Sequence, residues 1–230
     1  MESKSRISQL PETPEIRHRV ALDEYERRHF SDALRLACDL IDENFYHANA
    51  LAGAIFEEGG HGVEQDFEKA RFYYQRATET VGSLEGWLGL GRLYFFGKAV
   101  PRDFERAAQY YRAADEDADN AIAQLMLGRI YGDAEGPLFN AQRARTYLCK
   151  AANKGNVFAN TYWALLERDQ GNWFRSIWLR LKAATLAFCI TRKDSTNPRL
   201  RQCWQGRVRR DELEWHYANF RPRILSESHS

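Results

Sequence analysis

Apolar residues recur at helical spacing along most of this 230-residue chain, and the whole pattern returns after 37 or 38 residues. The repeating unit is clearest between positions 90 and 114, where it reads Leu90-Gly91, Tyr94, Gly97, Val100, Asp103, Arg106-Ala107 and Ala113-Ala114. Its register is marked by glycines and Asx residues that stand 37 or 38 positions apart, namely Gly53, Gly91 and Gly128, and Asp66, Asp103 and Asn140. A repeat of this length is typical of solenoids, in which each unit is a helix pair that packs on the next.

The pattern also predicts the order of segments. In an irregular first pair, one helix runs from Pro14 to Phe30 and a second starts at Ser31. Regular pairs are predicted at 47–81, 84–117 and 121–154, followed by a shorter pair with a turn at Gly171-Asn172 and a helix at 173–190. We therefore divide the chain into a flexible lead-in at 1–13, a degenerate N-terminal helix pair at 14–46, three repeats at 47–154, a degenerate fourth repeat at 155–190, and a C-terminal capping helix with a basic tail at 191–230. A cap is expected because the last repeat of a solenoid otherwise exposes its core face.

Two residue types recur at fixed points of the repeat for reasons of local structure. Each second helix begins at an Asx residue, whose side chain can accept hydrogen bonds from N–H groups of the first turn. Each first helix contains a glycine, although glycine costs a helix interior about 1 kcal/mol relative to alanine. Its return at one register predicts close contact between neighbouring helices. The aromatic residues of the second helices predict core packing rather than a cofactor site.

The string Leu-Gly-x-x-Tyr-x-x-Gly-x-x-Val-x-x-Asp-x-x-Arg-Ala, from Leu90 to Ala107, resembles the Sel-one-like repeat, a relative of the tetratricopeptide repeat. The resemblance is strong at 48–154 and weaker at 155–190. It implies an all-α, right-handed α-solenoid that binds partner proteins, as an adaptor in signalling, protein quality control or cell-envelope assembly. The cysteine-rich secreted branch of the family pairs cysteines within each repeat, and this sequence has none at those positions. Pro137 replaces the family's valine, so we expect an altered loop in the third repeat.

Composition narrows the class of protein. With 44% hydrophobic residues the chain can bury a sizeable core, and 33 Lys plus Arg against 32 Asp plus Glu leave a net charge of +1, which argues against a nucleic-acid-binding protein. The cysteines lack metal-ligand spacing and indicate thiols in a reducing compartment: Cys38, Cys149, Cys189 and Cys203. The first residues lack the apolar core of a secretory signal, so we expect a cytoplasmic location.

The resemblance places the first helices of the repeats on a concave surface. Counting from the motif glycines, the side chains expected to bind a partner there are Leu88, Arg92, Leu125, Met126 and Arg129. Arginine forks bind carboxylates bidentately, so the expected ligand is a partner protein or peptide with an acidic segment or C-terminal carboxylate. The alternative is that these arginines are solvated or pair with nearby acids such as Glu57 or Asp133.

A second candidate surface is the helix predicted at 173–190. Its mixture of aromatic and basic residues is typical of helices that lie at a membrane interface, and its candidate contact residues are Trp173, Phe174, Ile177 and Trp178. Cations interrupt the run, which excludes a spanning helix. Residues 191–230 add nine Lys plus Arg against five Asp plus Glu, an excess that favours an anionic surface. The alternative is that the apolar stripe is core between the last repeat and its cap.

Catalytic and metal chemistry find no support in the sequence. The six histidines form no H-E-x-x-H or comparable spacing. Gly86-x-x-Gly89-x-Gly91 resembles a phosphate loop but lies in a repeat helix with no strand before it, which favours close packing. We therefore expect a non-enzymatic scaffold or adaptor with no cofactor. Two alternatives stay open, an adaptor at the cytoplasmic membrane face in envelope or polysaccharide assembly and the regulatory subunit of an enzyme. A homo-oligomer is a further alternative, because solenoids also self-associate.

Overall fold

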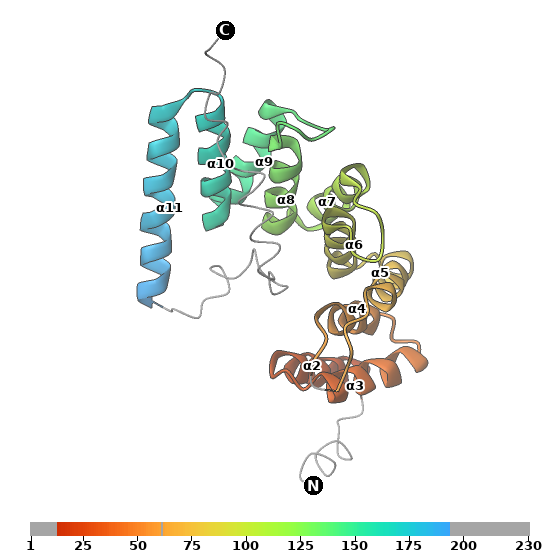
Figure 1. Cartoon of the computed structure of the whole chain (residues 1–230). Coiled ribbons are helices and arrows are strands. Elements are labelled where there is room, and N and C mark those ends of the chain that lie inside the picture. The colour runs from red at the N-terminus through yellow and green to blue at the C-terminus, as the bar shows by residue number, and fades with distance from the viewer. Residues whose placement is uncertain (1–12, 61, 194–230) are drawn as a thin grey trace.

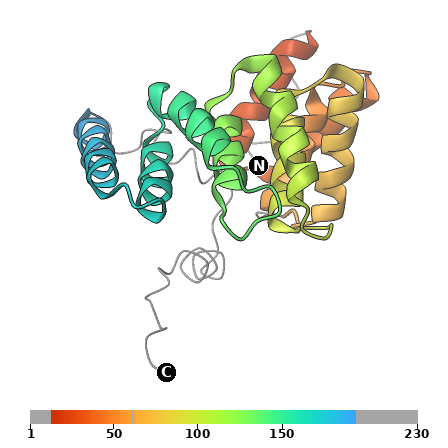
Figure 2. The same ribbon diagram turned by 90° about the horizontal axis from the view of Figure 1, so that it is seen from above.

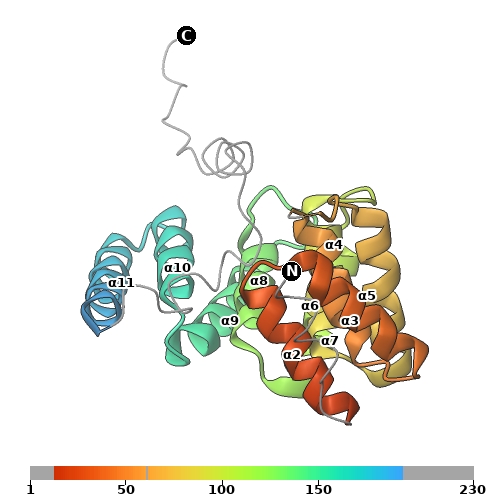
Figure 3. The same ribbon diagram turned by 90° about the horizontal axis from the view of Figure 1, so that it is seen from below.

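A computed structural model of the protein describes residues 13–60 and 62–193, which form ten α-helices (Figure 1). In chain order these are α2 (Pro14–Glu26), α3 (Phe30–Asp42), α4 (Ala48–Glu58), α5 (Phe67–Val81), α6 (Leu84–Phe96), α7 (Phe104–Ala118), α8 (Ala121–Gly132), α9 (Ala141–Asn153), α10 (Val157–Asp169) and α11 (Trp173–Lys193). Each helix packs on the one before and the one after it. The pairs form a curved row with α2 and α3 at one end and α11 at the other (Figures 2 and 3). The predicted all-α helical repeat fold is confirmed.

Helix boundaries agree with the sequence pattern except at the first pair and at the end of α11. The first helix was expected to reach Phe30, but α2 ends at Glu26. Arg28 adopts a left-handed backbone with φ of 70°, which breaks the helix, and Phe30 instead opens α3 as a buried core residue. Helix α11 continues past Ile190 to Lys193. Residues 1–12 of the predicted lead-in, and all but the first three residues of the predicted C-terminal cap and tail at 191–230, lie outside the described residues.

The Asx residues begin the second helices as the sequence predicts. The side chain of Asp66 accepts a hydrogen bond from the backbone N–H of Lys69. In the same way Asp103 accepts from the N–H of Arg106, and Asn140 accepts from the N–H of Arg143. Each bond satisfies an N–H group that has no partner within its own helix. The repeat therefore fixes where each second helix starts.

The motif glycines bring a first helix into contact with an aromatic ring. A Cβ atom added at Gly53 would lie 2.7 Å from the ring of Tyr74, and one added at Gly91 would lie 2.7 Å from the ring of Tyr111. At Gly89 the distance to Tyr74 would be 2.5 Å. These distances leave no room for a side chain, so the glycine series that resembles a phosphate loop serves helix packing.

Each of the three central pairs contains the same aromatic stack. A ring from the first helix lies 5.6 to 5.8 Å from a tyrosine ring of the second, and a cation from the first turn of the second helix lies 5.2 to 5.6 Å from the first ring. The three sets are Phe56, Tyr73 and Lys69; Tyr94, Tyr110 and Arg106; and Tyr131, Tyr147 and Arg143. Aromatic pairs of this kind contribute about 0.5–1.5 kcal/mol beyond the area that they bury. These tyrosines therefore hold the two helices of a pair together.

Candidate partner-binding site

Arg92, which the sequence assigns to an open groove, is bound to an acid of the preceding pair. Its Nε and Nη2 atoms donate to the two carboxylate oxygens of Glu57 at 2.9 and 2.7 Å. The hydroxyl of Tyr74 donates to the same carboxylate at 2.5 Å. Burial alone would lower the pKa of Arg92, but the charge and hydrogen bonds of Glu57 raise it well above its ordinary value. The alternative of a pair with Glu57 is therefore what the structure shows.

The three apolar residues predicted to flank the groove are buried. Leu88, Leu125 and Met126 are between 1% and 8% exposed and belong to the hydrophobic core. Leu88 and Leu125 lie three residues before a motif glycine, on the helical face that the glycine presents to the neighbouring helix. The expectation that they line an open groove is corrected on this ground.

Arg129 is partly buried between aromatic rings. Its guanidinium lies 4.8 Å from the centre of the Phe95 ring and 4.9 Å from that of Tyr162. Its Nη1 atom also approaches the sulfur of Met126 at 3.4 Å. Arg92 and Arg129 therefore do not form the pair of open arginine forks that the sequence suggests.

Helix α11 exposes a row of large hydrophobic side chains on the face opposite its packed face. The row contains all four residues singled out from the sequence and two more: Trp173, Phe174, Ile177, Trp178, Leu181 and Phe188. These side chains are between 55% and 93% exposed, whereas Ser176, Leu179 and Ala183 are buried against the stack. An apolar row of this kind on an exposed helix is a candidate interaction surface. The residues with which the sequence would cover it lie outside the described part of the chain.

The fourth pair also departs from the repeat at its aromatic stack. The eleventh residue of α6 is Tyr94 and that of α8 is Tyr131, and both are the stacked ring of their pair. The eleventh residue of α10 is Glu167. The third residue of the following helix stays cationic, because Arg175 takes the place of Arg106 and Arg143. The fourth pair thus has a carboxylate where the repeats have a ring.

The Glu167 carboxylate is fully buried and is bound by side chains from three helices or their ends. It accepts hydrogen bonds from Arg145 Nε of α9 at 2.8 Å, from Trp163 Nε1 at 2.9 Å and from Asn172 Nδ2 at 2.8 Å. Arg175 Nε lies 3.8 Å away. Burial alone would raise the pKa of Glu167, but these hydrogen bonds and the charge of Arg145 bring it below its ordinary value. The group is therefore an anion that holds two arginines.

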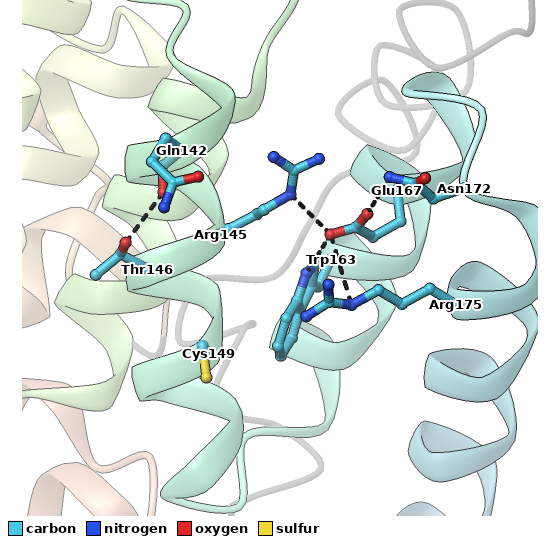
Figure 4. Close-up of a pocket in the computed structure, with 8 residues that line it drawn as sticks. All are labelled: Gln142, Arg145, Thr146, Cys149, Trp163, Glu167, Asn172 and Arg175. Atoms are coloured by element: carbon cyan, nitrogen blue, oxygen red, sulfur yellow. Dashed lines mark hydrogen bonds and ion pairs between the residues drawn. The ribbon is translucent and has the colours of Figure 1, made fainter.

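These residues line an open pocket of about 520 Å³ between α9, α10 and the start of α11. Its lining consists of Gln142, Arg145, Thr146, Cys149, Trp163, Glu167, Asn172 and Arg175. Figure 4 shows both arginines converging on Glu167 from opposite sides, with the terminal nitrogens of Arg145 directed away from it. The guanidinium of Arg175 lies over the Trp163 indole, 5.1 Å from its centre. Two cations and one buried anion make this pocket suited to an anionic group.

Sequence reasoning did not find the pocket, although a signal was present. Counting three residues on from the motif glycine gives Phe56, Tyr94 and Tyr131, and the same step from Ala164, which stands at the glycine's place in the fourth pair, gives Glu167. The contact between Arg145 and Glu167 could not be predicted in this way, because it depends on how α9 packs on α10.

The described residues hold no group of three or more His, Cys, Asp or Glu side chains that could bind a metal ion. Within residues 13–60 and 62–193, no helix combines the length and the apolar character needed to cross a membrane. Cys38, Cys149 and Cys189 are free thiols.

The comparisons with known proteins agree with the helical-repeat fold. The Sel1 repeat family matches the chain at residues 47–79, 88–114 and 121–156, which fall on the pairs α4–α5, α6–α7 and α8–α9. The chain is a Sel1-like repeat protein. No curated protein matches it significantly.

Two crystal structures show the same fold. A Sel1 repeat protein from Oxalobacter formigenes superimposes with a TM-score of 0.61 at 19% identity, over 90% of this chain and 87% of that one. The protective antigen c5321, present in uropathogenic Escherichia coli strains and displaying an SLR fold, gives a TM-score of 0.61 at 18% identity. That match covers 90% of this chain and 47% of c5321, so this chain spans about half of that relative.

The Sel1 match includes the site around Glu57 but not Glu167. Glu57 and Arg92 lie inside matched repeats, whereas the match ends at residue 156 and leaves Trp163, Glu167 and Arg175 beyond it. The pocket is therefore formed where the last Sel1 repeat meets the altered fourth pair.

Proposed function

We propose that this Sel1-like repeat protein is a non-enzymatic adaptor that binds a partner protein at the C-terminal end of its stack, on α9 to α11. Sel1 repeat proteins are generally protein-interaction scaffolds, which supports the class of function. The observation that carries the location is the exposed row on α11, with six large hydrophobic side chains beside an open, arginine-lined pocket. Tryptophan and arginine are the residues most enriched at the energetic centres of protein interfaces.

The first test is partner capture by the full-length protein, followed by identification of the bound protein and reconstitution of the purified complex. Trp178→Glu puts a charge into the row without touching the buried side of α11 and should abolish the reconstituted complex. Phe72 is a comparably exposed side chain on α5, far from the row, so Phe72→Glu is the matched control and should bind as wild type. Equal loss in both variants would contradict the location. A complex that Trp178→Glu leaves intact would do the same.

A second candidate function is docking at the inner face of a membrane, and the charge of α11 favours it. Residues 173–193 contain five Lys or Arg and no Asp or Glu, beside the exposed apolar row. Helices with this combination bind anionic lipid interfaces. Flotation of the purified protein with phosphatidylglycerol vesicles tests it, since no partner protein is present. Co-migration that is lost in Trp178→Glu and kept in Phe72→Glu supports membrane docking, and no co-migration of the wild type excludes it.

A further inference from the structure

We infer that the pocket between α9, α10 and α11 binds a carboxylate of an acidic segment in the partner protein, and that Arg145 and Arg175 are the residues that bind it. This inference rests on the proposed adaptor function and names the chemistry of its ligand. Its evidence comes from the substitution in the fourth pair, from the unused donors of the two arginines and from the shape of the pocket.

The first step is the replacement of a ring by Glu167. Three preceding pairs place an aromatic residue at this point, and the ring stacks on the second helix. A buried carboxylate is a costly replacement, because desolvation of a charge offsets much of what its partners contribute. Glu167 is nonetheless fully buried with three hydrogen-bond donors on it. Packing alone does not account for an acid here, whereas the positioning of Arg145 and Arg175 does.

The second step concerns the donors that the arginines have left. Arg145 contacts Glu167 through Nε only, and Arg175 approaches it through Nε at 3.8 Å. Among the residues that the structure describes, the terminal Nη atoms of both side chains make no hydrogen bond to a protein acceptor. The two side chains are 27% and 55% exposed, so these donors reach the open pocket. Paired N–H groups of this kind match the two oxygens of a carboxylate.

The third step is the fit of the ligand. A volume of about 520 Å³ accommodates an acidic side chain with part of its backbone. The Trp163 indole forms one wall and Thr146 and Gln142 supply neutral polar groups on another. The exposed apolar row begins at Trp173, two residues before Arg175, so a partner on α11 can place an acid in the pocket. An acidic segment with apolar neighbours therefore fits both surfaces at once.

The test is a fluorescence-anisotropy titration of a labelled decaglutamate peptide with the full-length protein at low ionic strength. We expect saturable binding to wild type and about tenfold weaker binding to Arg175→Gln, which removes one charged donor group. Arg175→Lys keeps the charge and loses the fork, and we expect it to bind as weakly as Arg175→Gln. Arg175 is more than half exposed, so both variants should fold.

Arg180→Gln is the matched control, because it removes the same charge from the same helix outside the pocket. It should bind decaglutamate as wild type does, and weakening equal to that of Arg175→Gln would show mere attraction to a basic helix and overturn the inference. Stronger competition by inorganic phosphate than by acetate at equal ionic strength would overturn the assignment of a carboxylate. No binding by wild type would also overturn it.

The failure of this inference and that of the adaptor proposal are separable. A purified partner complex that is lost in Trp178→Glu but unchanged in Arg175→Gln would retain the adaptor and exclude the carboxylate site. Loss in both variants supports both.

Discussion

Glu57 and Glu167 are both bound by arginine, but the two sites leave different donors for a ligand. Between α4 and α6, the first helices of two successive pairs, Arg92 donates two hydrogen bonds to Glu57 and Tyr74 donates a third. At α10, Glu167 takes a single Nε contact from Arg145 and has Arg175 nearby. The first site is closed, whereas the second holds two arginines whose terminal nitrogens face a pocket. The same residue types therefore make a structural cluster at one place and a candidate binding site at another.

The largest effect on stability should come from breaking the closed cluster of Glu57, Tyr74 and Arg92. Arg92→Ala leaves the Glu57 carboxylate nearly buried without its cation, and we expect the free energy of unfolding to fall by about 3 kcal/mol. Urea denaturation followed by circular dichroism measures it. The double variant Glu57→Leu, Arg92→Met removes both charges and should recover a large part of this loss. If Arg92→Ala lowered the free energy of unfolding by less than about 0.5 kcal/mol, the Glu57–Arg92 pair would be no stronger than an ordinary surface ion pair. That result would contradict the view of this site as a closed structural cluster.

A smaller loss of stability is expected when Glu167, the anion of the open site, is removed. Glu167→Ala leaves the N–H groups of Trp163 and Asn172 without their acceptor, and we expect a loss of about 2 kcal/mol. Glu167→Phe restores the ring of the other repeats and should cost less than Glu167→Ala in the same denaturation experiment. Greater destabilisation by the phenylalanine would show that the fourth pair cannot take the repeat's own residue.

The pH dependence of stability sharpens the role of Glu167. Its folded-state pKa lies below its ordinary value, so the folded protein favours the ionised form. Its contribution to stability is therefore complete above the unfolded-state pKa of about 4.3 and is lost as pH falls through the folded-state pKa. The stability difference between wild type and Glu167→Gln should be constant from pH 7 to pH 5 and narrow below about pH 4. A difference that grows on acidification would show the opposite shift.

The smallest effect should follow from Arg175→Gln. Arg175 is more than half exposed and lies beyond hydrogen-bond distance from Glu167, so we expect less than about 0.5 kcal/mol of lost stability. Thermal unfolding of this variant beside Arg92→Ala gives the contrast directly. A loss comparable to that of Arg92→Ala would make Arg175 a structural residue and remove the basis for a binding role.

The repeat allowed most of the described fold to be predicted, because its signals are local. Asp66, Asp103 and Asn140 begin helices through contacts three residues away, and Gly53 and Gly91 mark the places where a ring lies against a helix. The break at Arg28 was missed because a left-handed arginine has no strong sequence signature.

The candidate site was harder to predict because it depends on packing between pairs. The offset from Gly91 placed Arg92 on a surface, but the partner 35 residues earlier, Glu57, determines where its guanidinium lies. The pocket likewise needs Arg145 and Glu167 to meet across α9 and α10, 22 residues apart. By contrast, four of the six exposed residues of α11 could be named from the sequence, since a row at helical spacing with cations between its members is a local pattern, whereas Leu181 and Phe188 were not singled out.

The most direct measurement of the central claim is a side-chain NMR titration of the full-length wild-type protein with unlabelled decaglutamate, observing the Nε–H signals of assigned arginines. We expect the signals of Arg145 and Arg175 to shift with one common dissociation constant while that of Arg92 stays in place. Shifts at Arg92 with none at Arg145 or Arg175 would contradict the account, because the closed cluster and not the open pocket would then be the site that receives a carboxylate.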